Sequence, residues 1–161
     1  VDQFEHLPVS LRFIEFMDVG NHNRWRHNDI VPSSEIQNHL KKRLELIPID
    51  STYRGEVAQR WKVKGKNRFE IGFISSVSQP FCGDCTRARI SSDGQLFTCL
   101  FASTGTDLKS ILRDQSNERR LQDLISEIWK LRDDRYSELR SKTKKPGTII
   151  LPKIEMSYIG G

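Results

Sequence analysis

The spacing of the three cysteines constrains this chain more than any other feature of its sequence. Cys82, Cys85 and Cys99 form a C-x2-C-x13-C pattern within QPFCGDCTRARISSDGQLFTCLFA. Three thiols cannot all be paired in disulfides, and a secreted disulfide-stabilised domain normally carries a larger, even number of cysteines. We therefore expect a reducing, cytoplasmic environment and a role for the thiols other than disulfide formation.

A predicted β-hairpin brings the third cysteine back toward the CxxC pair. Residues 91–94, Ser-Ser-Asp-Gly, have the composition of a hairpin turn, and Gly83 is expected to ease the sharp turn inside the CxxC sequence. With this turn, Cys99 is expected opposite Thr86, one residue from Cys85. Three thiolates gathered in this way are typical of a metal site.

The kind of metal site stays open at this point. Structural zinc takes four ligands, and the fourth would have to come from a histidine that is distant from the hairpin in sequence: His6, His22, His27 or His39. A [4Fe–4S] cluster tolerates three cysteines and leaves one iron open to a substrate, so we favour it over zinc. The non-metal alternative is a thioredoxin-like redox pair with a separate core cysteine. It is weakened because the CxxC sequence precedes a hairpin rather than a helix start, where a thiolate would be stabilised.

Three arginines are candidates for binding an anion. Arg87 and Arg89 have the i, i+2 spacing that places them, with Cys85, on one face of a strand. Two guanidinium groups there form a clamp for phosphate or carboxylate oxygens, the alternative being a cross-strand charge pair on a solvated face. Arg12 interrupts the apolar run VSLRFIEFM, so it either reaches into a polar pocket or marks an exposed strand end.

The first third of the chain reads as a strand followed by a helix. Residues 9–17 are a mostly apolar run that predicts a buried strand. Residues 31–48 carry Ser34 and Gln37 at capping-box spacing and predict a helix that Pro48 ends. Strand then helix is one β/α unit of a larger parallel sheet or barrel.

The pattern changes after this unit. Residues 56–78 predict two strands around a Gly-Lys-Asn turn, and residues 85–101 predict a second hairpin. Residues 118–139 predict one long amphipathic helix whose apolar face carries Leu121, Leu124, Ile125, Ile128 and Leu131. We therefore divide the chain into residues 1–50, the end of a barrel, and residues 51–161, an α+β module that carries the cysteines.

Composition limits the remaining possibilities. The 161 residues are 36% hydrophobic and 29% charged, a soluble globular composition. Lys and Arg outnumber Asp and Glu by 26 to 21, which suits an anionic partner such as phosphates on a small molecule or nucleic acid. No apolar run approaches the roughly 20 residues that cross a bilayer, and we find no signal peptide. Because the sequence opens on Val1, we expect a fragment or a processed product.

On these residues the chain resembles the GTP 3′,8-cyclases, radical S-adenosylmethionine enzymes of molybdenum-cofactor biosynthesis. The resemblance rests on LRFIEFMDVGN, on SSVSQPFCGDCTRARISSDGQLFTCLF and on the terminal IEMSYIGG. It runs from about Leu11 to Gly161 and covers the C-terminal half of the family's length. It implies an α/β plus α+β fold: the last β/α unit of an incomplete (β/α)6 barrel, followed by an iron–sulfur module with antiparallel hairpins and helices.

The resemblance also implies cofactors and site residues. Three thiolates would hold a [4Fe–4S] cluster whose open iron binds the guanine ring of GTP: Cys82, Cys85 and Cys99. Three guanidinium groups would hold the triphosphate: Arg12, Arg87 and Arg89. A second [4Fe–4S] cluster, which binds S-adenosylmethionine through a CxxxCxxC motif, would belong to an N-terminal half that is not in this sequence. The tail Gly160-Gly161, which the sequence alone interprets as a frayed end, would enter the active site and act in catalysis.

These implications define the expected function. The chain would be the GTP-binding part of a lyase that converts GTP to (8S)-3′,8-cyclo-7,8-dihydroguanosine 5′-triphosphate, and alone it would have no cyclase turnover. Its expected partners are GTP and, through the N-terminal half, S-adenosylmethionine. We expect no membrane or nucleic acid, and a homodimer stays open. The alternatives are a zinc-ribbon-like nucleic-acid-binding module and a related radical enzyme with a different anionic substrate.

Overall fold

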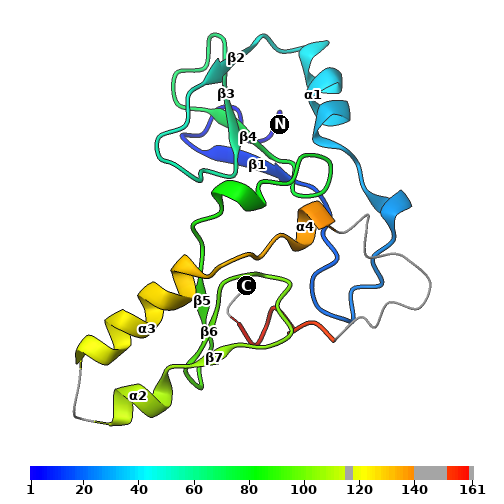
Figure 1. Ribbon diagram of the computed structural model, residues 1–161. Coiled ribbons are helices and arrows are strands. Elements are labelled where there is room, and N and C mark those ends of the chain that lie inside the picture. Colours follow the sequence, from blue (N-terminus) through cyan, green and yellow to red (C-terminus); the bar gives the residue numbers. More distant parts are fainter. Residues whose placement is uncertain (115–117, 140–151, 160–161) are drawn as a thin grey trace. The chain divides into compact units, whose positions relative to one another are not determined.

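The computed structural model describes residues 1–114, 118–139 and 152–159, and the chain divides into two compact units (Figure 1). The first unit is made of residues 1–17 and 25–86, and the second of residues 18–24 and 87–161. The chain therefore crosses from one unit to the other three times. No helix in the described ranges combines the length and the apolar sequence needed to cross a lipid bilayer.

A four-stranded mixed sheet forms the centre of the first unit. Its strands are β1 (Ser10–Ile14), β2 (Leu46–Ile49), β3 (Gln59–Val63) and β4 (Glu70–Ile74), in the order β1-β4-β3-β2. β1 runs parallel to β4, whereas β3 is antiparallel to both β4 and β2. The helix α1 (Ser33–Lys41) and the short 3-10 turns η1 (His27–Asp29) and η2 (Cys82–Asp84) complete the unit.

The core of the first unit lies between one face of this sheet and α1. Ile71 and Phe73 of β4 are fully buried, and Phe73 stacks on Phe13 of β1 with ring centroids 5.6 Å apart. Leu40 of α1 belongs to the same cluster of apolar side chains. Successive residues of a strand point to opposite faces, so Arg12, between the core residues of β1, lies on the face away from the core.

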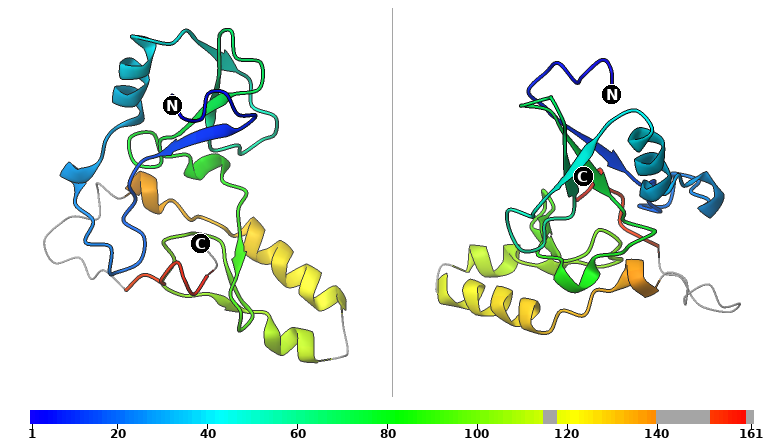
Figure 2. Two further views of the ribbon diagram at one scale, coloured as in Figure 1. Left: turned by 180° about the vertical axis from the view of Figure 1, so that it is seen from behind. Right: turned by 90° about the horizontal axis from the view of Figure 1, so that it is seen from above.

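In its described residues, the second unit has a three-stranded antiparallel sheet followed by helices, which Figure 2 shows from two further sides. Its strands are β5 (Arg89–Ile90), β6 (Gln95–Phe97) and β7 (Thr106–Asp107). Its helices are α2 (Lys109–Arg113), α3 (Glu118–Lys130) and α4 (Tyr136–Leu139). Where the structure describes this unit, its buried apolar side chains are Leu96, Phe97, Leu100, Leu108 and Ile159.

The prediction of a mixed α/β chain with two antiparallel hairpins is confirmed. The β3–β4 and β5–β6 pairs form around the predicted turns, and in both turns a glycine takes a positive φ, 80° at Gly65 and 88° at Gly94. These are backbone conformations that favour glycine. Among the described residues, neither sheet closes into a barrel.

The two predicted helices end earlier than expected. α1 ends at Lys41, so the prediction of a helix up to Pro48 is wrong, and Leu46–Ile49 forms β2 instead. β2 is an edge strand, where proline is tolerated because its missing N–H need not join the sheet. The predicted capping box at Ser34 is also absent. The N-cap residue of α1 is Pro32, and its side chain makes no capping hydrogen bond. The long helix stops at Lys130, and Leu131 beyond it is 74% exposed.

Candidate functional site

The CxxC sequence forms a tight turn in the first unit. Cys82 begins η2, and the backbone N–H of Cys85 donates to the Cys82 carbonyl at 3.2 Å. Both thiols are half-buried and neither belongs to a disulfide. The sequence predicts that Gly83 eases this turn, but the turn does not require glycine. Gly83 has no positive φ, and an added Cβ would meet nothing within 4 Å.

The glycine that this region does require is Gly55, which the sequence analysis did not single out. Its φ is +83°, and an added Cβ would lie 2.7 Å from the carbonyl oxygen of Asp84 and 2.8 Å from Oγ1 of Thr86. The loop around Gly55 and the CxxC turn line an open pocket of about 330 Å³, to which Tyr53 and Phe81 also contribute. A side chain at this position would push the loop away from the turn.

Arg12 lies exposed on the sheet face opposite the core, across from Gly72 of β4. Its side chain covers that glycine, because a Cβ at Gly72 would lie 3.3 Å from Cγ of Arg12. The nearby carboxylate is Glu56, whose side chain is only 5% exposed. Hydrogen bonds from Thr52 lower the pKa of Glu56; burial opposes them, and the charges of Arg60 and Arg12 add to the lowering.

Glu15 is a buried carboxylate whose role the sequence did not reveal. It is 3% exposed, and it accepts hydrogen bonds from the backbone N–H groups of Ser33, Val77 and Ser78 at 2.8–2.9 Å and from the Ser78 hydroxyl at 2.5 Å. Burial raises the pKa of Glu15, and these hydrogen bonds outweigh burial, so the net pKa is lowered. Glu15 thus joins the start of α1 to the loop after β4, from which the chain continues into the CxxC turn.

The second unit carries the other predicted site residues. Arg87 is exposed and precedes β5, while Arg89 is half-buried and opens the strand, paired with Phe97. This register is one residue away from the predicted one. Continued along both chains it would align Cys99 with Arg87, not with Thr86, but the strand pairing ends before either residue.

Arg132 fixes the segment that carries Cys99, and sequence reasoning missed it. Its side chain is 10% exposed; it donates to the Thr98 carbonyl at 2.7 Å and to the Asp134 carboxylate at 2.9 Å. The guanidinium also lies over the Trp129 ring, 4.9 Å from its centroid. Cys99 itself accepts a hydrogen bond at its Sγ from the Phe101 N–H at 3.5 Å.

The donor set suits thiolate chemistry. All three cysteines are half-buried and outside disulfides, as iron–sulfur ligands must be. Cys82 and Cys85 belong to the first unit and Cys99 to the second, and the described ranges contain no ready-made group of three or more Cys, His, Asp or Glu metal ligands. The gathering of the three sulfurs therefore stays a prediction. Gly160 and Gly161 lie outside the described residues.

Comparison with known proteins identifies the family. Residues 9–138 match the family model described as Molybdenum Cofactor Synthesis C. The chain is 47% identical over 164 aligned positions to a GTP 3′,8-cyclase of Xanthomonas campestris pv. campestris, covering 100% of this chain and 45% of that protein. It is 44% identical to the protein of the same name from Acidothermus cellulolyticus (94% of this chain, 47% of that protein) and 40% identical to that of Staphylococcus epidermidis (100% and 47%).

These matches are to the C-terminal part of the relatives. The chain therefore spans a little less than half the length of the curated proteins that it matches. The family model itself covers most of the chain, from before β1 to within α4. The chain belongs to the Molybdenum Cofactor Synthesis C family.

Proposed function

We propose that this chain is the C-terminal, GTP-binding part of a GTP 3′,8-cyclase, a radical S-adenosylmethionine lyase of molybdenum-cofactor biosynthesis. The observation that carries the proposal is the 40–47% identity to proteins of that name, which extends over 94–100% of this chain. Chance similarity or a shared fold alone would not preserve identity over such a length. The C-x2-C-x13-C sequence with its neighbouring arginines gives this similarity a chemical basis.

Cys82, Cys85 and Cys99 are the proposed ligands of a [4Fe–4S] cluster. When bound, such a cluster supplies an iron with an open coordination position, to which a nitrogen or oxygen of guanine can bind. The protein's own contribution is to hold the thiols. The η2 turn fixes the first two, and the hydrogen bond of Arg132 to the Thr98 carbonyl fixes the segment of the third.

Arg12, Arg87 and Arg89 are the proposed contacts of the triphosphate. Guanidinium groups bind phosphate oxygens through paired, charge-assisted hydrogen bonds, and each such bond contributes about 1.5–3 kcal/mol. Arg87 and Arg89 stand two and four residues after Cys85 in the sequence, so phosphates would be held near the base-binding iron. The tail Gly160-Gly161 is proposed to enter the same site, where glycine allows the closest backbone approach.

The remaining machinery is assigned to the N-terminal half of the complete enzyme. That half would bind S-adenosylmethionine and the second [4Fe–4S] cluster. Residues 1–50 of this chain would complete its partial barrel, and residues 51–161 would form the substrate-binding module. The chain alone should bind GTP without turning it over, because radical generation needs the missing cluster motif.

The test uses the full-length enzyme that contains this chain, with its clusters reconstituted without oxygen. GTP is added, and the magnetic resonance spectrum of the C-terminal cluster is recorded with unlabelled and 15N-labelled guanine. We expect nitrogen coupling at one iron, lost on Cys99→Ala. A colourless protein that binds zinc tightly and shows salt-dependent nucleic-acid affinity would refute the proposal, and an intact cluster that GTP does not perturb would point to a different anionic substrate.

Phosphate binding is tested separately with Arg87→Ala. GTP affinity should fall by about 1.5–3 kcal/mol, the strength of a charge-assisted hydrogen bond, while guanosine affinity stays unchanged. Arg113→Ala, at the exposed end of α2, is the matched control. An equal loss for GTP and guanosine would contradict the role of Arg87.

A further inference from the structure

The last described segment of the chain is tied to a loop from its beginning. Asn21 forms two hydrogen bonds with the backbone of Lys153: its Nδ2 donates to the carbonyl at 2.6 Å, and its Oδ1 accepts from the N–H at 3.1 Å. An amide side chain that pairs with both backbone groups of one residue acts like a neighbouring β-strand. It fixes the direction of the bound segment as well as its position.

Glu155 adds further hydrogen bonds between the C-terminal segment and the loop that carries Asn21. Its carboxylate accepts from the Asn21 backbone N–H at 2.8 Å and from Nδ2 of Asn21 at 2.9 Å, and it contacts Nδ1 of His22 at 2.9 Å. The hydrogen bonds from Asn21 lower the pKa of Glu155, with burial opposing them and His22 adding to them. Gly20 has a φ of +64°, and a Cβ there would collide with the Glu155 carboxylate.

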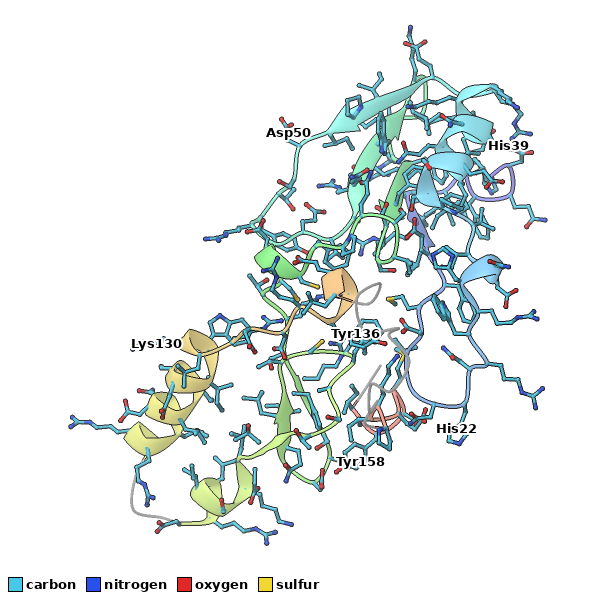
Figure 3. All side chains as sticks on the ribbon, turned by 45° about the vertical axis from the view of Figure 1, so that its right-hand side comes forward. His22, His39, Asp50, Lys130, Tyr136 and Tyr158 are labelled. Carbon is cyan, nitrogen blue, oxygen red and sulfur yellow. The ribbon has the colours of Figure 1, made fainter. Side chains whose placement is uncertain are left out.

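A largely buried ion pair lies beside these hydrogen bonds. The Lys153 ammonium donates to the Asp18 carboxylate at 2.9 Å and to the Asp18 carbonyl at 2.5 Å, and both side chains are about one-eighth exposed. The hydroxyl of Tyr136, a residue labelled in Figure 3, donates to the same carboxylate at 2.7 Å. Lys153 also lies over the Tyr136 and Phe101 rings, 4.6 and 5.2 Å from their centroids.

The segment stays attached up to the end of the described chain. The Ile154 N–H donates to the Ala102 carbonyl at 3.0 Å, and the Tyr158 hydroxyl donates to the Asp93 carboxylate at 2.6 Å. Tyr158 also meets Phe97 edge to face, and Ile159 is 1% exposed. Chain ends are usually loose unless something ties them down. Here the hydrogen bonds of Lys153, Ile154, Glu155 and Tyr158 and the burial of Ile159 hold the segment at both of its ends.

We propose that residues 18–22 are a clasp that positions the C-terminal tail for the reaction, with Asn21 as its central positioning residue. This inference rests on the proposed role of Gly160 and Gly161. A tail that takes part in a reaction must start from a fixed point, because small displacements of a reacting group cost large factors in rate. The clasp fixes that point through Asn21, Glu155 and the Asp18–Lys153 pair. The loop that carries it is the direct continuation of the β1 segment, which holds Arg12.

The test compares Asn21→Ala with Asn38→Ala in the full-length enzyme that contains this chain. Asn38 is an exposed asparagine of α1, so the same chemical change there is a matched control. Amide hydrogen exchange of residues 153–159 should become about tenfold faster in Asn21→Ala, the factor expected from losing about one net hydrogen bond. The kcat should fall by at least about as much, with KM for GTP within about twofold. Exchange in β4 should not change, which separates a loosened tail from a misfolded protein.

Further variants keep the inference falsifiable. Gly20→Ala should reproduce both effects, because its φ of +64° strains alanine and its Cβ would displace the Glu155 carboxylate from Asn21. Asn21→Asp should be worse than Asn21→Ala, because it faces the Glu155 carboxylate, and Glu155→Gln should partly rescue it. If deleting Gly160 and Gly161 leaves turnover unchanged, the proposed role of the tail is wrong. If that deletion abolishes turnover but Asn21→Ala loosens the tail without lowering kcat, or fails to loosen it, the clasp inference is overturned.

Discussion

Replacing Glu15 with glutamine should destabilise the fold far more than its conservative appearance suggests. Glu15 is the acceptor for three backbone N–H groups and one hydroxyl in a buried position. Glutamine can keep its oxygen toward the N–H groups of Val77 and Ser78. Its amide nitrogen then replaces Oε1, which the Ser33 N–H and the Ser78 hydroxyl had used.

The magnitude follows from what each donor can do next. The Ser78 hydroxyl can rotate and accept from the new amide, but the Ser33 N–H cannot reverse its role and is left buried beside another donor. Losing one hydrogen bond to a charged group and leaving one buried donor unsatisfied costs about 2–4 kcal/mol in total. Because Ser33 is the first residue of α1, the loss should loosen the start of that helix.

Urea unfolding at neutral pH measures the effect, with Glu35→Gln as the control. Glu35 lies exposed in the first turn of α1, where removing its charge should cost less than about 1 kcal/mol. The pKa of Glu15 is lowered in the folded protein, so its stabilisation is present above the ordinary carboxylate pKa and is lost as the pH falls through the lowered one. The gap between wild type and Glu15→Gln should therefore shrink in acid. Equal losses for the two variants would refute this reasoning.

Three other substitutions give clear expectations. Gly55→Ala should cost about 1–3 kcal/mol in thermal unfolding because of its positive φ and the close backbone of the CxxC turn, whereas Gly83→Ala should be near neutral; a reversed order would contradict the structure. Phe73→Ala removes a fully buried ring and should cost about 3–5 kcal/mol in urea unfolding, and a loss below about 1 kcal/mol would show that the core lies elsewhere. Arg132→Gln weakens the hydrogen bond to the Thr98 carbonyl, so it should shorten the lifetime of the proposed cluster's visible absorbance under a chelator by about tenfold. An unchanged lifetime would show that Arg132 does not hold the cysteine segment.

The local elements could be predicted because their signals are local. The turns at Gly65 and Gly94 are specified by a few adjacent residues with the right φ preferences, and both hairpins form there. The end of α1 was predicted wrongly for the opposite reason. Residues 46–49 become a strand because they pair with residues 60–63, and that pairing partner cannot be recognised from the helical spacing of the apolar residues alone.

The candidate site divides in the same way. Cysteines and arginines in an unusual spacing stand out by residue type, so Cys82 or Arg87 could be selected from the sequence. Glu15 and Arg132 look like ordinary charged residues, and only the partners that the fold brings to them, 18 to 63 residues away for Glu15 and 34 for Arg132, show their roles. Nothing in the sequence around Gly55 shows that this glycine, with its positive φ and close neighbours, is the one that cannot carry a side chain.

The interleaving of the two units limits how this protein can be dissected. Residues 18–24 are encoded between two stretches of the first unit, yet they complete the second. A truncation that begins at Arg87 would therefore discard Asp18 and Asn21 and leave Lys153 and Glu155 exposed to water. Neither unit is one continuous stretch of sequence. An exchange of the second unit between relatives must therefore include residues 18–24 together with the C-terminal part.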